Sequence, residues 1–307
     1  MKKFNQSLKS IFLILLIVLF FTYCSDNQKQ SAEVKTGYDF SFAFFTDIHV
    51  QPEKNAVSGF QKAIRKANSL NPDFVLTGGD LIMDALEVSY ERAESLYDLY
   101  KDQSTRFTMP VFNTMGNHEV FGWYEKSGVK DDHPFFGKKL FEEKIGKSFY
   151  SFDYKNWHFI ILDSIMRDED GGYFGRVSEE QISWLKNDLS NVDPNTPIVI
   201  STHIPLISVM HQIRKGTDQL PGRSLIIVNS KDVLDLFLEH NLKLVLQGHL
   251  HYREEIRING ITFISVGAVC GEWWDGPYQG FEEGFGLIKV KGDNFTFQYI
   301  DYGWEVK

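Results

Sequence analysis

The sequence predicts an α/β domain that is closed by a layer of antiparallel strands. Short apolar runs alternate with amphipathic segments between residues 40 and 251, and strands alternating with helices are typical of layered α/β domains. Two alternating runs then meet at Asn259-Gly260, the strongest short signal of a β-hairpin. The chain has 307 residues and is 43% hydrophobic, so it can form a sizeable core.

The first predicted strand is the apolar and aromatic run Phe40–Val50, which turns polar at Thr46. Residues 55–70 carry apolar side chains three and four positions apart, which predicts an amphipathic helix. Ser178 and Gln181 have the spacing of a capping box, so a helix is expected from there through Leu189. The same patterns predict strands at 73–80, 110–119, 157–164, 196–205 and 242–251, helices at 87–102 and 230–240, and hairpins over 254–269 and 284–302.

The N-terminal segment has the pattern of a secretory signal peptide over residues 1–23. Lysines precede an unbroken apolar run, Ile11–Phe21, which at about 1.5 Å per residue covers only about half of a hydrocarbon core of roughly 30 Å. Export to the periplasm or the cell envelope is therefore expected. Residues 24–38 are polar and predict a flexible tether, which places the folded domain at 39–307.

Cys24 lies where the signal of a bacterial lipoprotein is cleaved and the new N-terminal cysteine is acylated, and the segment resembles that class. Tyr23 departs from the pattern, because these signals usually carry a small residue at that position. If Cys24 is acylated, the lipid anchors the protein to a membrane. The alternatives are a plain cleaved signal and an uncleaved anchor.

The net charge of −9 argues against a nucleic-acid-binding surface, since an acidic protein repels phosphate backbones and no block of Lys or Arg stands out. A nuclease is disfavoured for the same reason. A small phosphate-ester substrate stays compatible with this charge, because bound metal ions can supply local positive charge.

Several predicted strands end in side chains that commonly bind metals. Ligand sites in α/β sheets gather outside the carboxyl ends of strands, so these ends can converge in space. His249 and His251 lie two positions apart, and in an extended chain both rings then face the same way. Each residue taken singly is equally well explained as a turn former, a helix cap or a core histidine, but together they predict a metal centre. The candidates are Asp47, His49, Asp80, Asn117, His118, His203, His249 and His251.

These strand ends resemble the motif blocks of the calcineurin-like metallophosphoesterase family, and all five blocks occur in the family's order over residues 42–252. The resemblance implies a four-layer fold, a β sandwich of two sheets flanked by helices, to which this chain adds C-terminal antiparallel hairpins. The blocks are D-x-H at 47–49, G-G-D at 78–80, G-N-H-E at 116–119, a strand-end His203 and G-H-x-H at 248–251.

The resemblance also implies a role for each candidate. Asp80 would bridge two metal ions, and His118 would be the catalytic histidine that binds no metal. One ion would be held by Asp47, His49 and His251, and the other by Asn117, His203 and His249. Carboxylate, amide and imidazole donors suit two divalent or trivalent ions of Mn, Fe or Zn.

The implied activity is hydrolysis of phosphate esters by a metal-bridging hydroxide, with His118 protonating or stabilising the leaving oxygen. Phosphodiesters, including nucleotides and cyclic nucleotides, compete with phosphomonoesters as the substrate class. The alternative from another class is a catalytically inactive metal-binding or scaffolding protein on the cell envelope.

The chain departs from many relatives at Met83, where they carry an aspartate that orients the catalytic histidine. Asp84 follows directly and is an alternative for that task. Purple acid phosphatases, a branch of the family, carry Gly at the position of His49 and Tyr at that of Met83. This chain has neither, so it is not expected in the purple branch.

Two aromatic segments are candidates for substrate binding, because aromatic rings stack on bases and sugars, although such residues also simply fill a core. The long intervals 119–156 and 205–229 lack strong periodicity and are expected to be loops that shape a cleft. His133, His158, His211, His240 and Asp163 match no motif block and are taken as ordinary residues. The substrate-binding candidates are Trp123, Tyr124, Trp273 and Trp274.

Overall fold

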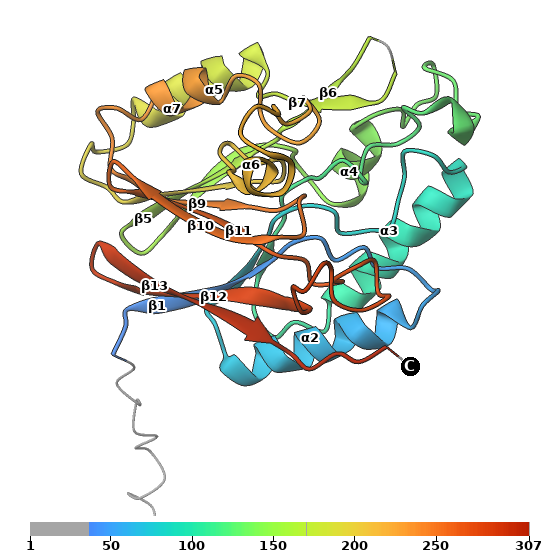
Figure 1. Ribbon diagram of the computed structural model, residues 1–307, viewed down its shortest axis with the longest axis horizontal. Coiled ribbons are helices and arrows are strands. Elements are labelled where there is room, and N and C mark those ends of the chain that lie inside the picture. Colours follow the sequence, from blue (N-terminus) through green and yellow to red (C-terminus); the bar gives the residue numbers. More distant parts are fainter. Residues whose placement is uncertain (1–36, 170, 307) are drawn as a thin grey trace, which may run out of the picture. The chain divides into compact units, whose positions relative to one another are not determined.

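The computed structural model describes residues 37–169 and 171–306 (Figure 1). Asp39–Lys307 forms one compact unit. The predicted signal peptide, Cys24 and the tether up to residue 36 lie outside the described residues. Within the described ranges, no helix is long and apolar enough to cross a membrane.

The strands of this unit form two large sheets and a small ribbon. In spatial order, the first sheet contains β13 (Asn294–Asp301), β12 (Gly284–Lys291), β1 (Phe40–Phe45), β2 (Phe74–Thr77) and β3 (Val111–Phe112). The second contains β10 (Arg253–Ile258), β11 (Ile261–Val266), β9 (Leu242–Gln247), β8 (Ile198–Thr202), β5 (Trp157–Leu162) and β4 (Tyr150–Tyr154). The ribbon pairs β6 (Ile165–Arg167) with β7 (Tyr173–Gly175).

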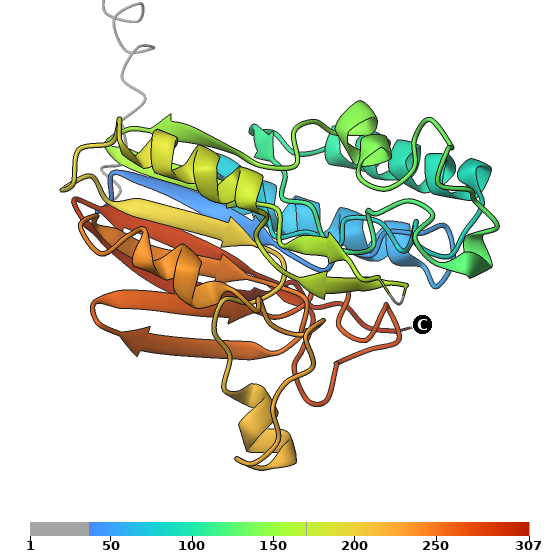
Figure 2. The same ribbon diagram turned by 90° about the horizontal axis from the view of Figure 1, so that it is seen from above.

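Helices cover the outer faces of the two sheets, which gives four layers (Figures 1 and 2). The first sheet is covered by α2 (Ala56–Leu70) and α3 (Tyr90–Ser104), and the second by α5 (Glu179–Leu189) and α7 (Ser230–Asp235). The shorter helices are η2 (Glu125–Ser127), α4 (Lys139–Lys144) and α6 (Met210–Lys215), and α6 stands out from the sheets in Figure 2. The predicted α/β sandwich with C-terminal antiparallel hairpins is confirmed.

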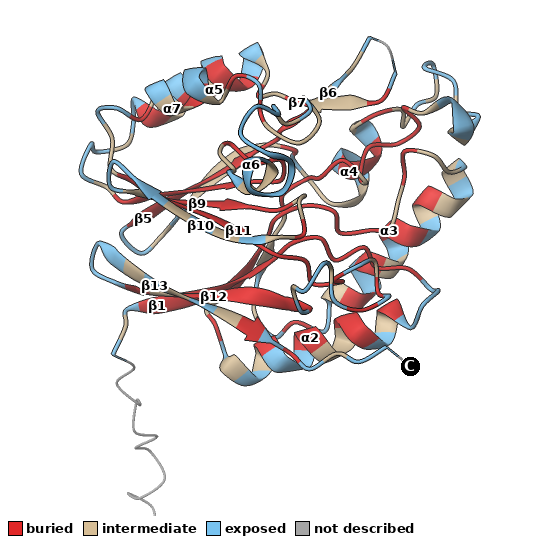
Figure 3. Cartoon of the chain, in the orientation of Figure 1, coloured by how far each residue is buried: buried red, intermediate tan, exposed pale blue. Residues whose placement is uncertain are grey.

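Strand β1 shows why its sequence is apolar throughout. Phe42 and Phe44 face the second sheet, and Ala43 and Phe45 face the helices, so all six residues of the strand are buried. Alternate residues of a strand point to opposite faces, and a strand covered on both faces therefore loses the usual polar alternation. Figure 3 shows the same burial across the inner strands of both sheets.

Local signals account for several element ends. Ser178 caps α5 by accepting a hydrogen bond from the Gln181 N–H (3.2 Å). Only this half of the predicted capping box forms, because the Gln181 amide bonds instead to the backbone N–H and carbonyl of Asp163. At the predicted hairpin turn, Asn259 and Gly260 both have positive φ, 51° and 82°, as a type I′ turn requires.

Three expectations differ from the structure. The strand predicted at 110–119 is only the two-residue β3, and the helix predicted at 230–240 ends at Asp235 and continues as tight turns. The interval 119–156, taken as a loop, contains α4 and β4. Tyr150, Phe152 and Tyr154 of β4 pack between the sheets, and their period-two alternation is a strand signal that the sequence did carry.

Candidate metal centre

The metal-ligand candidates follow strands of both sheets and meet where these strands end. Asp47 and Asp80 follow the parallel neighbours β1 and β2 of the first sheet. His203 and His249 follow the parallel neighbours β8 and β9 of the second. Of the seven candidates, His249 is half-buried and the other six are buried: Asp47, His49, Asp80, Asn117, His203 and His251.

Asp80 lies at the middle of the cluster. Its Oδ2 is 3.1 Å from His203 Nε2, 3.5 Å from His49 Nε2 and 3.9 Å from His118 Nε2. Two groups of donor atoms close enough to hold one ion each share this carboxylate. One group contains His49 and His118, and the other contains His203 and His249.

Further pairs extend the cluster on either side of Asp80. Asp47 Oδ1 is 3.3 Å from His251 Nε2, and the His49 and His251 rings are 5.3 Å apart. On the other side, His203 Nε2 is 3.0 Å from Asn117 Oδ1 and 3.2 Å from His249 Nδ1. Asp47, His49 and His251 thus lie on one side of Asp80, and Asn117, His203 and His249 lie on the other.

Backbone carbonyls fix the orientation of three of the imidazoles. His203 Nδ1 is 2.8 Å from the Gly78 carbonyl, His251 Nδ1 is 2.7 Å from that of Gly271, and His249 Nε2 is 2.9 Å from that of Ser224. A ring nitrogen that donates to a carbonyl leaves the opposite nitrogen free as a metal donor. In each ring that opposite nitrogen faces another member of the cluster.

His49 supplies the test of whether a metal fits. Its side chain is completely buried, yet neither ring nitrogen has a hydrogen-bond partner. Burying an unpaired polar group costs free energy. A cation bound between His49 Nε2 and Asp80 would give that nitrogen a partner, and the donor set of carboxylate, amide and imidazole is one that Mn, Fe and Zn accept.

Close packing shifts the pKa values of the cluster in both directions. Burial, and then the charge of His118, lowers the pKa of His49 to about 3. Burial, and then the charge of His203, lowers the pKa of His249 to about 3. Burial raises the pKa of the Asp80 carboxyl, but His203 and His118 outweigh it and hold that pKa well below its usual range. Burial lowers the pKa of His203, but Asp80 outweighs it and raises that pKa to about 9, so a metal ion at this ring would displace a proton.

The backbone of the cluster is left-handed at Asp47, His49, Asp80, His249 and His251, with φ between 45° and 70°. Residues other than glycine seldom adopt this conformation, and Asp, Asn and His are among those that tolerate it. Strained backbone persists only where the surrounding structure holds it. The turns after β1, β2 and β9 therefore depend on buried contacts around them.

Glu119 is the main such contact, and sequence reasoning gave it no role. Its buried carboxylate accepts hydrogen bonds from the backbone N–H groups of Asp80 (2.9 Å), Leu81 (2.7 Å), Ile82 (3.2 Å) and Gly116 (2.7 Å). It thus joins the turn after β2 to the G-N-H-E turn of which it is the last residue. Burial, and then the charge of Asp80, raises the pKa of Glu119 to about 7.

The glycine of G-H-x-H is required by a close approach of the two sheets. A Cβ atom on Gly248 would lie 2.0 Å from Thr46 Oγ1 and 2.7 Å from Asp47 Oδ2. The absent side chain lets the backbone N–H of His249 donate to Asp47 Oδ1 at 3.0 Å. The turn after β9 is thereby joined to the turn after β1.

His118 lies at the edge of the cluster, and its side chain is 24% exposed. Its Nδ1 is 2.6 Å from the Met83 carbonyl and 3.4 Å from Asp84 Oδ1, so its Nε2 faces Asp80. Met83, where many relatives carry an aspartate, thus holds the His118 ring through its backbone carbonyl. Asp84 lies beside the same ring nitrogen. Burial lowers the pKa of His118, but Asp80 and then Asp84 outweigh it and raise that pKa to about 9.

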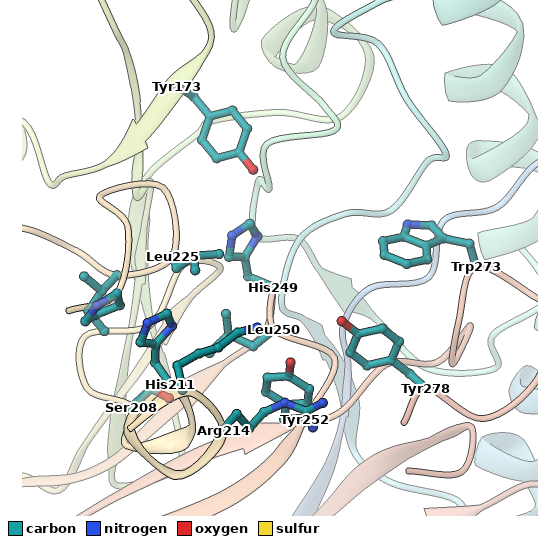
Figure 4. Close-up of a pocket in the computed structure, with 13 residues that line it drawn as sticks. Tyr173, Ser208, His211, Arg214, Leu225, His249, Leu250, Tyr252, Trp273 and Tyr278 are labelled. Atoms are coloured by element: carbon teal, nitrogen blue, oxygen red, sulfur yellow. The ribbon is translucent and has the colours of Figure 1, made fainter. Parts of the chain in front are cut away.

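A cavity of about 360 Å³ opens beside the cluster, and we call it the side cavity (Figure 4). His249 and Trp273 form its boundary with the metal centre, and most of its remaining wall comes from the interval 205–229 and from tyrosines. Its lining residues are Tyr173, Ser208, His211, Arg214, Lys215, Pro221, Leu225, Ile226, His249, Leu250, Tyr252, Trp273 and Tyr278.

The four predicted substrate-binding aromatics lie in different environments. Trp273 lines the side cavity, whereas Trp274 is only 1% exposed and donates a hydrogen bond from Nε1 to the His49 carbonyl (3.0 Å). Trp123 is buried in the core, and Tyr124 packs against that core beside Gly172. None of the last three is among the described residues that line the side cavity.

The interval 205–229 was expected to shape a cleft, and it supplies much of the side cavity, but the sequence did not indicate which residues line it. His211 matches no motif block, and nothing in the sequence singles out Arg214. Tyr252 directly follows the last histidine, and Tyr278 ends the same aromatic segment as Trp273, so their positions beside known motifs were the available signal. Cys270 was also missed, and its buried thiol lies with His49 and His251 at the cluster.

Comparison with known proteins identifies the family. Residues 40–253 match the family model described as calcineurin-like phosphoesterase. The chain belongs to this family. The phosphoesterase is accordingly a metal-dependent hydrolase, and its resemblance to the family is confirmed.

Curated relatives of the phosphoesterase cover most of its length. A 3′,5′-cyclic-nucleotide phosphodiesterase from Nostoc sp. is 25% identical over 240 residues, covering 75% of this chain and 78% of the relative. A probable cyclic nucleotide phosphodiesterase from Xenorhabdus bovienii is 24% identical over 270 residues, covering 84% of this chain and 93% of the relative.

Solved structures share the fold of the phosphoesterase. A dimetal phosphatase from Danio rerio has a TM-score of 0.62 at 15% identity, covering 87% of this chain and 97% of its own. A purple acid phosphatase from yellow lupin has a TM-score of 0.57 at 16% identity, covering 86% and 51%. These likenesses support the two-sheet architecture and do not assign the chain to a branch.

Proposed function

We propose that the protein is a two-metal phosphodiesterase that hydrolyses nucleotide diesters, cyclic ones included. The observation that carries the proposal is the position of Asp80, whose carboxylate belongs to both groups of donor atoms. The relatives from Nostoc and Xenorhabdus are both named as phosphodiesterases of cyclic nucleotides, which supports a diester substrate.

In this proposal the two sides of the cluster hold one ion each. Asp47, His49 and His251 bind the first, Asp80 binds both, and the second is bound by Asn117, His203 and His249. When bound, the ions supply positive charge to the phosphoryl oxygens and activate a water molecule. Mn, Fe and Zn all suit these donors.

His118 completes the proposed site as the general acid. Its Nδ1 is held by the Met83 carbonyl, and its Nε2 faces the centre and can carry a proton. Water loses a proton to solvent as it attacks phosphorus, the P–O bond to the leaving group breaks, and the Nε2 proton passes to the leaving oxygen, after which the ring takes up a proton from solvent. The Met83 carbonyl and the Asp84 carboxylate on the Nδ1 side favour the protonated ring.

Metal analysis combined with three substrates tests the proposal. We expect metal-depleted protein reloaded with Mn²⁺ to contain two ions per chain. It should hydrolyse 3′,5′-cyclic AMP and bis-p-nitrophenyl phosphate faster than p-nitrophenyl phosphate, and activity should disappear on chelation. One ion or fewer per chain, or a preference for the monoester, would contradict it.

We also propose export and lipid attachment through Cys24, on the sequence pattern alone. Labelled palmitate should enter the wild-type protein and not the Cys24→Ser variant during expression in a bacterial host. Equal labelling of both proteins would exclude this anchor.

A further inference from the structure

We infer that the side cavity is a binding site for the planar base of a nucleotide substrate. Three rings form its recognition surface, and we call them the aromatic corner: Trp273, Tyr278 and Tyr252. This inference rests on the proposed phosphodiesterase function and adds to it the part of the substrate that the metal centre does not contact.

The aromatic corner begins at the metal centre. The Trp273 ring is 4.8 Å from the ring of His251, one of the candidate ligands. Tyr278 follows at 5.9 Å from Trp273 with the ring planes at 83°, and Tyr252 stacks on Tyr278 at 5.5 Å and 25°. Two nearly perpendicular rings let a planar group lie face-on against one and edge-on against the other.

The backbone directs Trp273 and Trp274 to opposite sides. Both residues have positive φ, 47° and 73°, in a turn that places Trp274 in the core and leaves Trp273 half-buried at the side cavity. The hydrogen bond from Trp274 to the His49 carbonyl ties this turn to the metal centre. The exposed face of Trp273 is thus held in place beside the position of the phosphate.

The rest of the side cavity has apolar residues in its wall and a basic outer rim. Leu225 and Leu250 line the wall close to His249 (Figure 4). The Arg214 guanidinium lies 4.9 Å from the centre of the Tyr252 ring, with Lys215 beside it on α6. In a protein of net charge −9, this rim attracts an anionic substrate to an apolar and aromatic pocket.

The segment that carries Arg214 is fixed at its base. Gln247 accepts hydrogen bonds from the backbone N–H groups of Leu206 and Ile207, and Glu254 accepts one from Val209 at 2.8 Å. Gln247 ends β9 and Glu254 lies in β10, so both strands hold the segment before α6 begins. Arg214 is therefore held in contact with the Tyr252 ring.

The charges of the side cavity decide which planar or bulky group it suits. An aromatic cage can also hold a quaternary ammonium, such as the choline of a glycerophosphodiester. Arg214 and Lys215 repel such a cation, and they are compatible with an uncharged base attached to an anionic phosphate. A volume of about 360 Å³ is within the range of small-molecule pockets, which begins at about 300 Å³.

A pair of cyclic diesters that differ only in the base tests the inference. The full-length, Mn²⁺-loaded protein is assayed with 3′,5′-cyclic AMP and with the methyl riboside 3,5-cyclic phosphate, which has no base. We expect kcat/KM to be at least about tenfold higher with the base, as stacking of one base allows. Equal values for the two diesters, or higher values for glycerophosphocholine than for cyclic AMP, would overturn the inference.

Variants of Tyr278 locate the effect. Tyr278→Leu should raise the KM for cyclic AMP about tenfold and leave the values for the diester without a base unchanged, because only stacking is lost. Tyr278→Phe keeps the ring and should behave as the wild type. An equal loss on both diesters in Tyr278→Leu would contradict a base site.

A binding measurement separates this inference from the proposed function. If the protein hydrolyses neither diester, the proposed function fails, and the base site is then judged by calorimetry with AMP and ribose 5-phosphate. AMP binding at least about tenfold tighter, with the difference lost in Tyr278→Leu, supports the site. Equal affinities for the two monophosphates would overturn it.

Discussion

The metal centre and the side cavity share a boundary at His249 and Trp273 but are built in different ways. Every candidate ligand lies within five residues of the end of a strand, in a turn fixed by buried hydrogen bonds. The wall of the side cavity comes mainly from the interval 205–229 and the turn around Trp273, which lie outside the two large sheets.

This difference indicates which part of the site is free to vary. Shifting a ligand at a strand end disturbs the packing of both sheets, whereas a change in the cavity wall alters a loop that is held only at its base. The residues that determine the reaction type therefore depend on the fold. The residues that determine substrate choice lie in segments that can change while the fold stays the same. The following variants probe this separation from the largest expected effect to the smallest.

Asp80→Asn should cause the largest loss, because it removes the carboxylate shared by both groups of donor atoms. We expect kcat/KM to fall at least about a hundredfold, with fewer ions bound per chain. Metal analysis and assays with both cyclic diesters measure the effect. Asp131→Asn, at an exposed ion pair with Arg167, is the matched control and should leave both quantities unchanged. A loss limited to the diester that carries a base would contradict the separation.

His118→Asn should lower kcat about 10²- to 10⁴-fold while two ions remain bound, since His118 serves the leaving group and is no ligand in our proposal. The loss should be much smaller for bis-p-nitrophenyl phosphate, because p-nitrophenolate leaves without a proton. Equal losses for that substrate and for cyclic AMP would remove the general-acid role. Loss of metal in the variant would instead make His118 a ligand.

Glu119→Gln should destabilise the centre without touching the side cavity. The amide cannot accept all four backbone hydrogen bonds, so we expect the free energy of unfolding to fall by about 1–3 kcal/mol and metal affinity about 10- to 100-fold. Urea unfolding and metal titration measure these changes. The exposed Glu125 offers the control Glu125→Gln. An unchanged metal affinity would show that Glu119 does not position the turns.

His158, far from both regions in the β4–β5 pair, should affect stability alone. Its ring nitrogens lie 2.7 Å from Asp153 and 2.8 Å from Asp188 of α5. Burial lowers the pKa of His158, but Asp188 and Asp153 outweigh it and raise that pKa, whereas the pKa of Asp188 is lowered against burial by His158. We expect His158→Gln to cost about 1–2 kcal/mol of unfolding free energy, with kcat/KM unchanged.

The loss of unfolding free energy in His158→Gln should depend on pH in a defined direction. A raised histidine pKa adds stability that is complete below the unfolded value of about 6.5 and is lost as pH rises through the folded value. The Asp188 share is lost as pH falls through its lowered pKa. The free energy of unfolding of the wild type should therefore exceed that of His158→Gln most near pH 5. A difference that grows above pH 8 would contradict the pairing of His158 with Asp153 and Asp188.

Arg214→Ala should have the smallest effect. A cation over an exposed ring is worth about 0.5–1 kcal/mol, so we expect the KM for cyclic AMP to rise two- to fivefold with kcat unchanged. Initial rates at low and at physiological salt give the KM values of the wild type and the variant. The difference between these KM values should shrink as the salt concentration rises. A larger fall in kcat than in affinity would connect α6 to the chemistry.

The sequence predicted that the candidate ligands converge, but it did not predict the residues around them, for physical reasons. Strand-end residues such as Asp47 and His203 follow buried apolar runs, and the sheets bring such ends together whatever the loops do. Helix α6 is too short to show a periodic pattern. Trp273 and Trp274 point in different directions because distant contacts fix the backbone of their turn. The sequence alone could therefore not show which of the two adjacent tryptophans lines the cavity and which lies in the core.

The left-handed turns limit how the centre could be redesigned. A random library at Asp47, His49, Asp80, His249 and His251 should yield folded protein mainly with glycine, asparagine, aspartate or histidine, since β-branched residues are strained at positive φ. Exchanges among these few residues are thus open to protein engineers. Introducing other ligand types requires rebuilding the turns themselves.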